Sequence, residues 1–317
     1  MAFSPPGFGG DAPDGSPDFT GASVLGLVAA GGVYTLLNPL ICTTLTVRTG
    51  FTLKTDGYPL VAGTLVIEPG AVVHANGNNA VGGLGGAIQT TRGFMGWSSA
   101  VGGAGGSRTL AGTTVGGAGG GSGSNAFGGA GGSGGAAGAS FATLSLGGAG
   151  NITAQASAST RRMLHTQVYA NTGWKGLGLG ALLSAVNGGG GGGGGAVYWG
   201  VATLGAQLDG GGGGGAAGGL GIYCAQLDNR GSILATGGDG AAGLVVSGTI
   251  TDGGAAGGGG GSGGWIHLSV SQIINLGTIS AAGGNAGAGI GFGVHYKEDG
   301  TPGANGPVIV LVNGRPL

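Results

Sequence analysis

Runs of consecutive glycine constrain the fold of this chain more than any other feature. Glycine makes up 89 of the 317 residues, and the longest run covers residues 188–195. Glycine is a poor helix former, and it offers a β-sheet no side chains to pack. The remaining regular backbone is extended and polyproline-II-like, with three residues per turn, so that neighbouring glycine segments can approach and hydrogen-bond laterally. The runs therefore predict a bundle of polyglycine-II helices.

Collagen and flexible linkers are also rich in glycine. Collagen requires glycine at every third position and abundant proline, whereas this chain has 10 prolines and its glycines come in pairs and long runs. Gly/Ser tracts are flexible linkers by default. Here the residues between glycines are mostly apolar and only 7% of the chain is charged, so an unfolded chain would expose apolar surface with little charge to keep it soluble. We therefore interpret the runs as architecture, with the linker as the alternative.

Short segments with β-strand character surround the runs. Between residues 33 and 76 they recur every seven to ten residues and mostly end in Gly, Asp-Gly or Pro-Gly, the pattern of a strand followed by a tight turn. The fold class expected is all-β, with stacked short strands in a β-solenoid or β-sandwich-like arrangement beside the polyglycine-II bundle.

An internal repeat links the strands to the glycine runs. GGGGGAAGGLGIYCAQL from Gly211 and GGGGGSGGWIHLSVSQI from Gly257 each continue into a second strand and a polar turn, NRGSILATGGDG and NLGTISAAGGN. Such a unit cannot bury its own apolar face, so copies must stack on one another or across subunits. Ordering glycine also costs roughly 0.5–1 kcal/mol more per residue than ordering alanine, which requires dense backbone hydrogen bonding. We expect a homo-oligomer, preferably a trimer.

Changes in composition divide the chain into three parts. Residues 1–22 are rich in Pro, Gly and Asp and form an N-terminal arm, residues 23–81 form a β-rich domain, and residues 82–317 form a glycine-rich repeat domain. We expect no secretory signal, because the N-terminal residues have no basic region before an apolar stretch. The most apolar window, residues 24–41, is interrupted by Gly32, Asn38 and Pro39 and is a poor membrane span.

Chemistry-bearing residues are few and scattered. GxGxxG matches open no helical pattern, the four histidines form no ligand spacing, and the net charge of −1 does not suggest a nucleic-acid surface. We therefore expect no catalysis, no cofactor and no metal. The alternative enzyme is a polysaccharide depolymerase, which would need paired carboxylates such as Asp228 and Glu298 beside Asp299.

Large side chains cluster in inserts where the glycine segments must turn, at the ends of a bundle. Rigid aromatics at loop tips suit contacts with carbohydrate or protein, although the same side chains could instead pack between subunits. The candidate receptor-contact residues are Phe94, Met95, Trp97, Trp174, Phe292, His295 and Tyr296.

The strand segment VYTLLNPLICTTLTVRTGFTLKTDGYPLVAGTLVIEPGAVVHANGNNAVGGLGG from Val33 and the later GGGGGSGGWIHLSVSQIINLGTISAAGGNAG from Gly257 resemble glycine-rich tail-fibre and related virion proteins of tailed bacteriophages. The resemblance implies a virion structural protein that takes part in host attachment, located on the tail or particle surface and made in the host cytoplasm without a signal peptide. It implies three partners: further copies of the chain, other virion proteins held through the N-terminal arm, and a host surface glycan or protein. Nucleic-acid binding and membrane insertion are not expected.

Two other functions remain open. A capsid decoration or head-fibre protein would have the same composition without receptor binding. A polyglycine bundle could also bind ice through a flat threonine-rich face such as TTLTVRT from Thr43.

Overall fold

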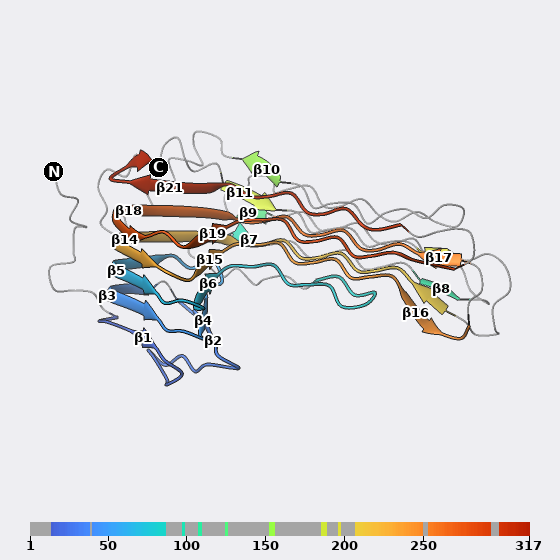
Figure 1. Cartoon of the computed structure of the whole chain (residues 1–317), viewed down its shortest axis with the longest axis horizontal. Coiled ribbons are helices and arrows are strands. Elements are labelled where there is room, and N and C mark those ends of the chain that lie inside the picture. The colour runs from blue at the N-terminus through green and yellow to red at the C-terminus, as the bar shows by residue number, and fades with distance from the viewer. Residues whose placement is uncertain are drawn as a thin grey trace.

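The computed structural model describes residues 14–38, 40–86, 207–249, 253–292 and 298–317, and the backbone of six short strands between residues 97 and 197. Every regular element in these residues is a β-strand, which confirms the predicted all-β class for the described part of the chain. The strands of the two larger sheets gather at one end of the molecule, the glycine runs extend from them as a rod, and β8, β16 and β17 lie at the far end (Figure 1).

The larger sheet has seven strands in the order β1-β3-β5-β14-β18-β21-β22. All neighbouring pairs are parallel except β21 and β22, which are antiparallel. The strands are β1 (Asp18–Phe19), β3 (Leu40–Val47), β5 (Leu60–Ile67), β14 (Gly219–Asn229), β18 (Trp265–Asn275), β21 (Val308–Val312) and β22 (Arg315–Pro316).

The second sheet has five parallel strands in the order β19-β15-β6-β4-β2. They are β2 (Val33–Thr35), β4 (Thr52–Lys54), β6 (Val72–His74), β15 (Ser232–Leu234) and β19 (Thr278–Ser280). Each long strand of the larger sheet is followed by a short strand of the second sheet, as β3 is by β4 and β14 by β15. We call each such pair of strands a rung. The domain boundary predicted between residues 81 and 82 falls inside both sheets. In the larger sheet β5 pairs with β14, and in the second sheet β6 pairs with β15.

The remaining strands form small antiparallel sheets. Their orders are β16-β13-β8, β12-β17-β20, β10-β11 and β7-β9. The strands are β7 (Trp97–Ser98), β8 (Ser107–Thr109), β9 (Ser124–Asn125), β10 (Ile152–Gln155), β11 (Ala185–Gly188), β12 (Ala196–Val197), β13 (Gln207–Asp209), β16 (Leu244–Ser247), β17 (Gly253–Ala255) and β20 (Ile290–Phe292).

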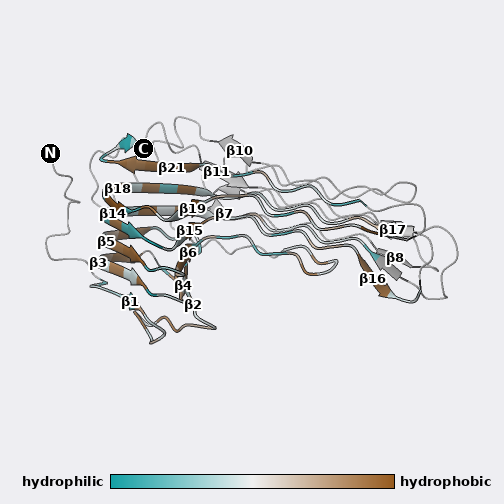
Figure 2. Ribbon diagram, viewed as in Figure 1, coloured by the Kyte–Doolittle hydropathy of each residue, from teal (hydrophilic) through white to brown (hydrophobic). Residues whose placement is uncertain are grey.

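The hydrophobic core lies where the rungs stack. In the short strands TLK, VVH and SIL only the central residue is buried, so Leu53, Val73 and Ile233 form one buried row in register. A second buried row runs through Leu45, Leu65 and the third rung's Leu227. Figure 2 shows the apolar strands concentrated in the two sheets. Burying these rows drives the stacking, because each removes apolar surface from water.

The glycine runs are continuous with the rungs. The runs 210–218, 256–264 and 298–306 lead into β14, β18 and β21, whereas the runs 75–86, 235–243 and 281–289 follow β6, β15 and β19. We call the first set the inbound layer and the second set the outbound layer. Neighbouring runs are parallel within a layer and antiparallel between layers, as their hydrogen-bond partners show.

Backbone hydrogen bonds between runs repeat every three residues. Gly257, Gly260 and Gly263 donate to carbonyls of the neighbouring inbound run, at residues 298, 301 and 304, over 2.9–3.0 Å. The next residues along, Gly258, Gly261 and Gly264, donate across to the outbound layer at residues 241, 238 and 235. Two of every three amides in this run are therefore used to join it to other runs.

The same period explains where glycine is obligatory. A Cβ atom added to Gly258 or Gly261 would overlap the carbonyl oxygen of Gly212 or Gly215 in the neighbouring run. The third position of each triplet admits side chains, and in the run 256–264 it holds Ala256, Gly259 and Ser262. In the last run, 298–306, glycine occurs only at every third residue, at Gly300, Gly303 and Gly306. Glycine content therefore falls at the edge of the array, where neighbours are fewer.

Substituting one central glycine tests this packing. Gly261→Ala places a methyl group against the Gly215 carbonyl and should lower the free energy of unfolding by about 3 kcal/mol, the upper range for overpacking a core. The matched control is Ala288→Val, which adds larger side-chain volume at an exposed third position of a neighbouring run. Denaturant unfolding of both variants measures the difference, and equal stability of the two variants would contradict the packing.

Candidate functional site

Most of the predicted contact residues lie outside the described residues: Phe94, Met95, Trp174, His295 and Tyr296. Trp97 begins β7, which pairs with β9, and Phe292 ends β20, where it lies opposite Gly253 of β17. The backbone placement of these two residues is described, but their role as contacts stays a prediction.

A polar groove with a volume of about 770 Å³ lies where the second sheet meets the outbound layer. After β6 the chain continues outward as the run 75–86, whereas after β4 it turns back at Asp56 and Gly57, both of which have positive φ, and enters β5. The outbound layer of glycine runs therefore begins beside Lys54 and leaves it uncovered. The resulting step between the second sheet and the outbound layer forms the groove. The residues that line it are Val33, Lys54, His74, Asn76, Gly77, Asn78, Asn79, Thr236, Gly237, Asp239, Ala282, Gly283 and Asn285.

The wall of the groove carries a lysine and a neutral histidine. Lys54 and His74 are paired in register on neighbouring strands, and Lys54 Nζ lies 3.1 Å from Asp56 Oδ1. Burial, with a further contribution from the Lys54 charge, lowers the pKa of His74 to about 4. His74 Nδ1 accepts a hydrogen bond from the Asn76 backbone N–H over 3.1 Å, so the ring proton lies on Nε2.

The floor of the groove is an ordered set of side chains at the third positions of adjacent runs. Asn76 Oδ1 accepts the Thr236 backbone N–H over 2.9 Å, and Asn79 Oδ1 accepts that of Asp239 over 2.8 Å. Asp239 Oδ1 in turn accepts the backbone N–H of Asn285 over 2.7 Å and its Nδ2 over 3.1 Å. Each side chain thus fixes the next run in register. Asn79 Nδ2, Asn285 Oδ1 and Asp239 Oδ2 take no part in these bonds.

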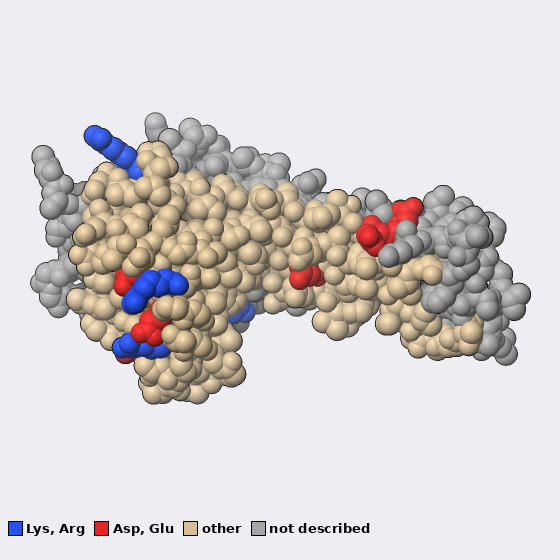
Figure 3. Space-filling model, viewed as in Figure 1, with Lys and Arg blue, Asp and Glu red and all other residues tan. Residues whose placement is uncertain are grey.

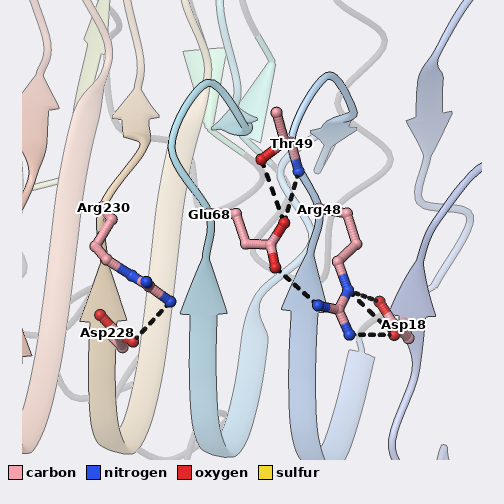
Figure 4. Close-up of polar contacts among 6 residues, drawn as sticks. All are labelled: Asp18, Arg48, Thr49, Glu68, Asp228 and Arg230. Atoms are coloured by element: carbon pink, nitrogen blue, oxygen red, sulfur yellow. Dashed lines mark hydrogen bonds and ion pairs between the residues drawn. The ribbon is translucent and has the colours of Figure 1, made fainter.

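A charged ladder lies at the opposite ends of the long strands (Figure 4). Arg48 donates to Asp18 through Nε and Nη2 over 2.9 and 2.8 Å and to Glu68 through Nη1 over 2.7 Å. Glu68 also accepts the Thr49 backbone N–H, which lowers its pKa, with Arg48 as the next cause. The charged side chains seen in Figure 3 gather mainly over the two sheets. Exposed ion pairs contribute little to the free energy of folding individually. We therefore assign this ladder a positioning role: its bonds from Arg48 to Asp18 hold β1 beside β3.

Of the carboxylates considered for depolymerase chemistry, Asp228 does not share a site with Glu298 and Asp299. Asp228 lies near the end of β14, where it contacts Arg230 over 3.2 Å and accepts a hydrogen bond from Asn275 over 2.8 Å. Glu298 begins the last run, and its carbonyl accepts the Gly257 N–H, whereas the neighbouring Asp299 accepts the Gly289 N–H. The length of the run 298–306 and of the strand β14 separates Asp228 from Glu298 and Asp299, and the carboxylates of Asp228 and Asp299 each have a structural contact. In the described ranges no three His, Cys, Asp or Glu residues form a group that could hold a metal ion.

His267 is a buried core residue on β18. It is 1% exposed, its Nδ1 lies 3.4 Å from the Tyr223 hydroxyl, and the two rings pack edge to face with centroids 5.5 Å apart. Burial lowers the pKa of His267 to about 4 and raises that of Tyr223. His267 is therefore neutral at physiological pH and contributes to packing.

The groove was not predicted from the sequence. The sequence does contain a signal for it. Asn, Thr and Asp replace glycine at every third position in NGNN from Asn76, TGGDG from Thr236 and AGGN from Ala282. Recognising that signal requires knowing which runs are neighbours, since the three segments are far apart along the chain.

Comparison with known proteins gives no assignment: no family model, no curated protein and no solved structure matches this chain. A search of the described residues for a helix long and apolar enough to cross a membrane found none. Function is therefore inferred from the geometry of the chain itself.

Burial of His267 predicts sensitivity to acid. Its pKa is about 4 in the folded chain against an ordinary value of 6.5, so between these pH values the unfolded chain binds more protons. The free energy of unfolding should therefore fall as the pH is lowered from 6.5 towards 4, with a contribution of up to about 1.4 kcal/mol per pH unit from this residue. Unfolding measured between pH 7.5 and 4 should show a shallower pH dependence for His267→Phe than for the unmodified chain; identical slopes would contradict the assignment.

Proposed function

We propose that this protein is a structural protein of a virus particle, a bacteriophage tail fibre or appendage that takes part in host attachment. The observation that carries the proposal is the continuity between the stacked rungs and the hydrogen-bonded glycine runs, because it makes one elongated body from a nearly uncharged chain. A body of this kind suits mechanical support and display.

The finer fold belongs to the same proposal. We infer that the rungs form a β-solenoid whose coils alternate between the two sheets, and that the runs form a polyglycine-II bundle. Support for the bundle comes from the three-residue hydrogen-bond period and from glycine at positions where a Cβ would overlap a carbonyl of a neighbouring run. Support for the solenoid comes from the parallel pairing and the matching strand order of the two sheets.

The rod separates two ends with different roles. At the sheet end, the described part of the N-terminal arm is fixed to the first rung: Asp14 accepts the Ile41 N–H over 2.8 Å, and β1 pairs with β3. We propose that the arm, residues 1–22, connects the chain to other virion proteins. At the far end of the rod, which we call the tip, lie β8, β16 and β17 (Figure 1), and Leu244 and Val246 of β16 are 45% and 47% exposed. Exposed apolar side chains there suit contact with a host glycan or protein.

The mechanism would combine stiffness with multivalency. A rigid rod loses little conformational entropy when its tip binds, and several copies in a homotrimer or on one particle would engage several weak sites at once. No catalytic step is required.

Locating the chain in its particle tests the proposal. Gold-labelled antibody against the purified protein should mark tail fibres or another appendage in electron micrographs of the particle. Labelling spread over the capsid lattice would contradict attachment and favour a decoration protein.

Competition for adsorption tests the attachment step separately. Purified protein should reduce adsorption of the particle to its host, and the double variant Leu244→Ser with Val246→Ser should compete about tenfold less well, since two exposed apolar contacts are lost. Gln272→Ala, at an exposed position of β18 in the larger sheet, is the matched control and should compete as the unmodified protein does. Equal competition by all three proteins would contradict a contact role for β16.

A further inference from the structure

We propose that the polar groove at the step between the second sheet and the outbound layer binds a segment of neutral polysaccharide. The inference does not depend on where the chain lies in a particle, because it rests on the groove alone.

The groove presents both kinds of hydrogen-bonding group in a small area. Donors are available from the wall and floor at His74 Nε2–H and Asn79 Nδ2, and acceptors at Asp239 Oδ2 and Asn285 Oδ1. Hydroxyl groups both donate and accept, so a ligand dense in hydroxyls can use both sets. Saccharides are the chemical class with that property throughout their length.

The balance of charge favours a neutral ligand. Lys54 at the wall is paired with Asp56 over 3.1 Å, and Asp239 is the carboxylate of the floor. A polyanion would be repelled by the Asp239 charge and a polycation by the Lys54 charge, whereas the neighbouring His74 is uncharged at neutral pH and repels neither. Discrimination against both arises because an unpaired charge brought close to a like charge is unfavourable.

The floor is held in place before any ligand arrives. Asp239 receives two hydrogen bonds from Asn285 and donates its own backbone N–H to Asn79, so the row is ordered across three runs. Binding to side chains that are already ordered costs less conformational entropy than binding to mobile ones.

The shape suits an extended chain. Three residues of such a run advance about 9 Å, which separates the row of Asn76 from the row of Asn79 along the groove. The lining combines four asparagine amides, the Thr236 hydroxyl and glycine backbone with the apolar Val33 and Ala282, so it offers more polar groups than the mainly apolar pockets typical for drug-sized molecules. A divalent cation is disfavoured because Asp239 supplies the carboxylate of the lining without a second one beside it.

An array of neutral and acidic bacterial surface polysaccharides, probed with the full chain, tests the inference. The unmodified protein should bind at least one neutral polysaccharide. Asn285→Ala and Asp239→Ala should each bind it about tenfold more weakly, the factor expected for the loss of a hydrogen bond. Gln272→Ala, on the larger sheet, should bind normally.

Further variants and a folding check keep the result interpretable. Lys54→Gln removes the ammonium of the wall, whose remaining N–H donors can reach a ligand, without touching the bonds that hold the runs in register, and it should also weaken binding. Asp56→Asn breaks the same ion pair from outside the groove lining and is the matched control: it should share any change in melting temperature but keep its binding. Retention of acidic polysaccharides only, no retention of any neutral polysaccharide, or unchanged binding by all the groove variants would overturn the proposal. Each outcome is distinct from the adsorption result, which concerns the tip.

Discussion

The backbone hydrogen bond between neighbouring glycine runs is the interaction on which the rest of this molecule depends. Runs such as 256–264 contain few side chains that could form a hydrophobic core, so their order comes from amides paired with the carbonyls of other runs. That pairing requires close approach, and close approach requires glycine where a Cβ would meet a carbonyl oxygen. Composition, period and packing are therefore consequences of one constraint.

The rungs supply what the runs lack. Buried rows such as Leu45–Leu65–Leu227 fix the register of the long strands, and since each run is continuous with a strand, they also set which runs are neighbours. At the edges of the larger sheet and of the glycine layers, a short strand and two side chains satisfy backbone groups. β22 pairs with the last two residues of β21 at the edge of the larger sheet, and Asn305 Oδ1 and Asp299 Oδ1 accept the N–H groups of Gly283 and Gly289 at the edge of the outbound layer.

Part of this architecture could be predicted from the sequence because local chemistry determines it. The all-β class follows from segments such as TLK and VVH between tight turns, and glycine runs exclude helix by propensity. Which glycine runs become neighbours could not be predicted, because stretches of identical glycine residues do not specify the register in which two runs pair. The groove depends on that pairing: Lys54, Asn79 and Asp239 are far apart in the chain and become neighbours only when the rungs stack.

Amide hydrogen exchange at the centre of the array tests the account most directly. The amides of Gly258, Gly261 and Gly264 donate across the two layers, so we expect them to exchange slowly, at rates set by global unfolding. Exchange of these three amides at the rate of an unstructured glycine peptide would show that the run is a flexible linker and would contradict the central claim.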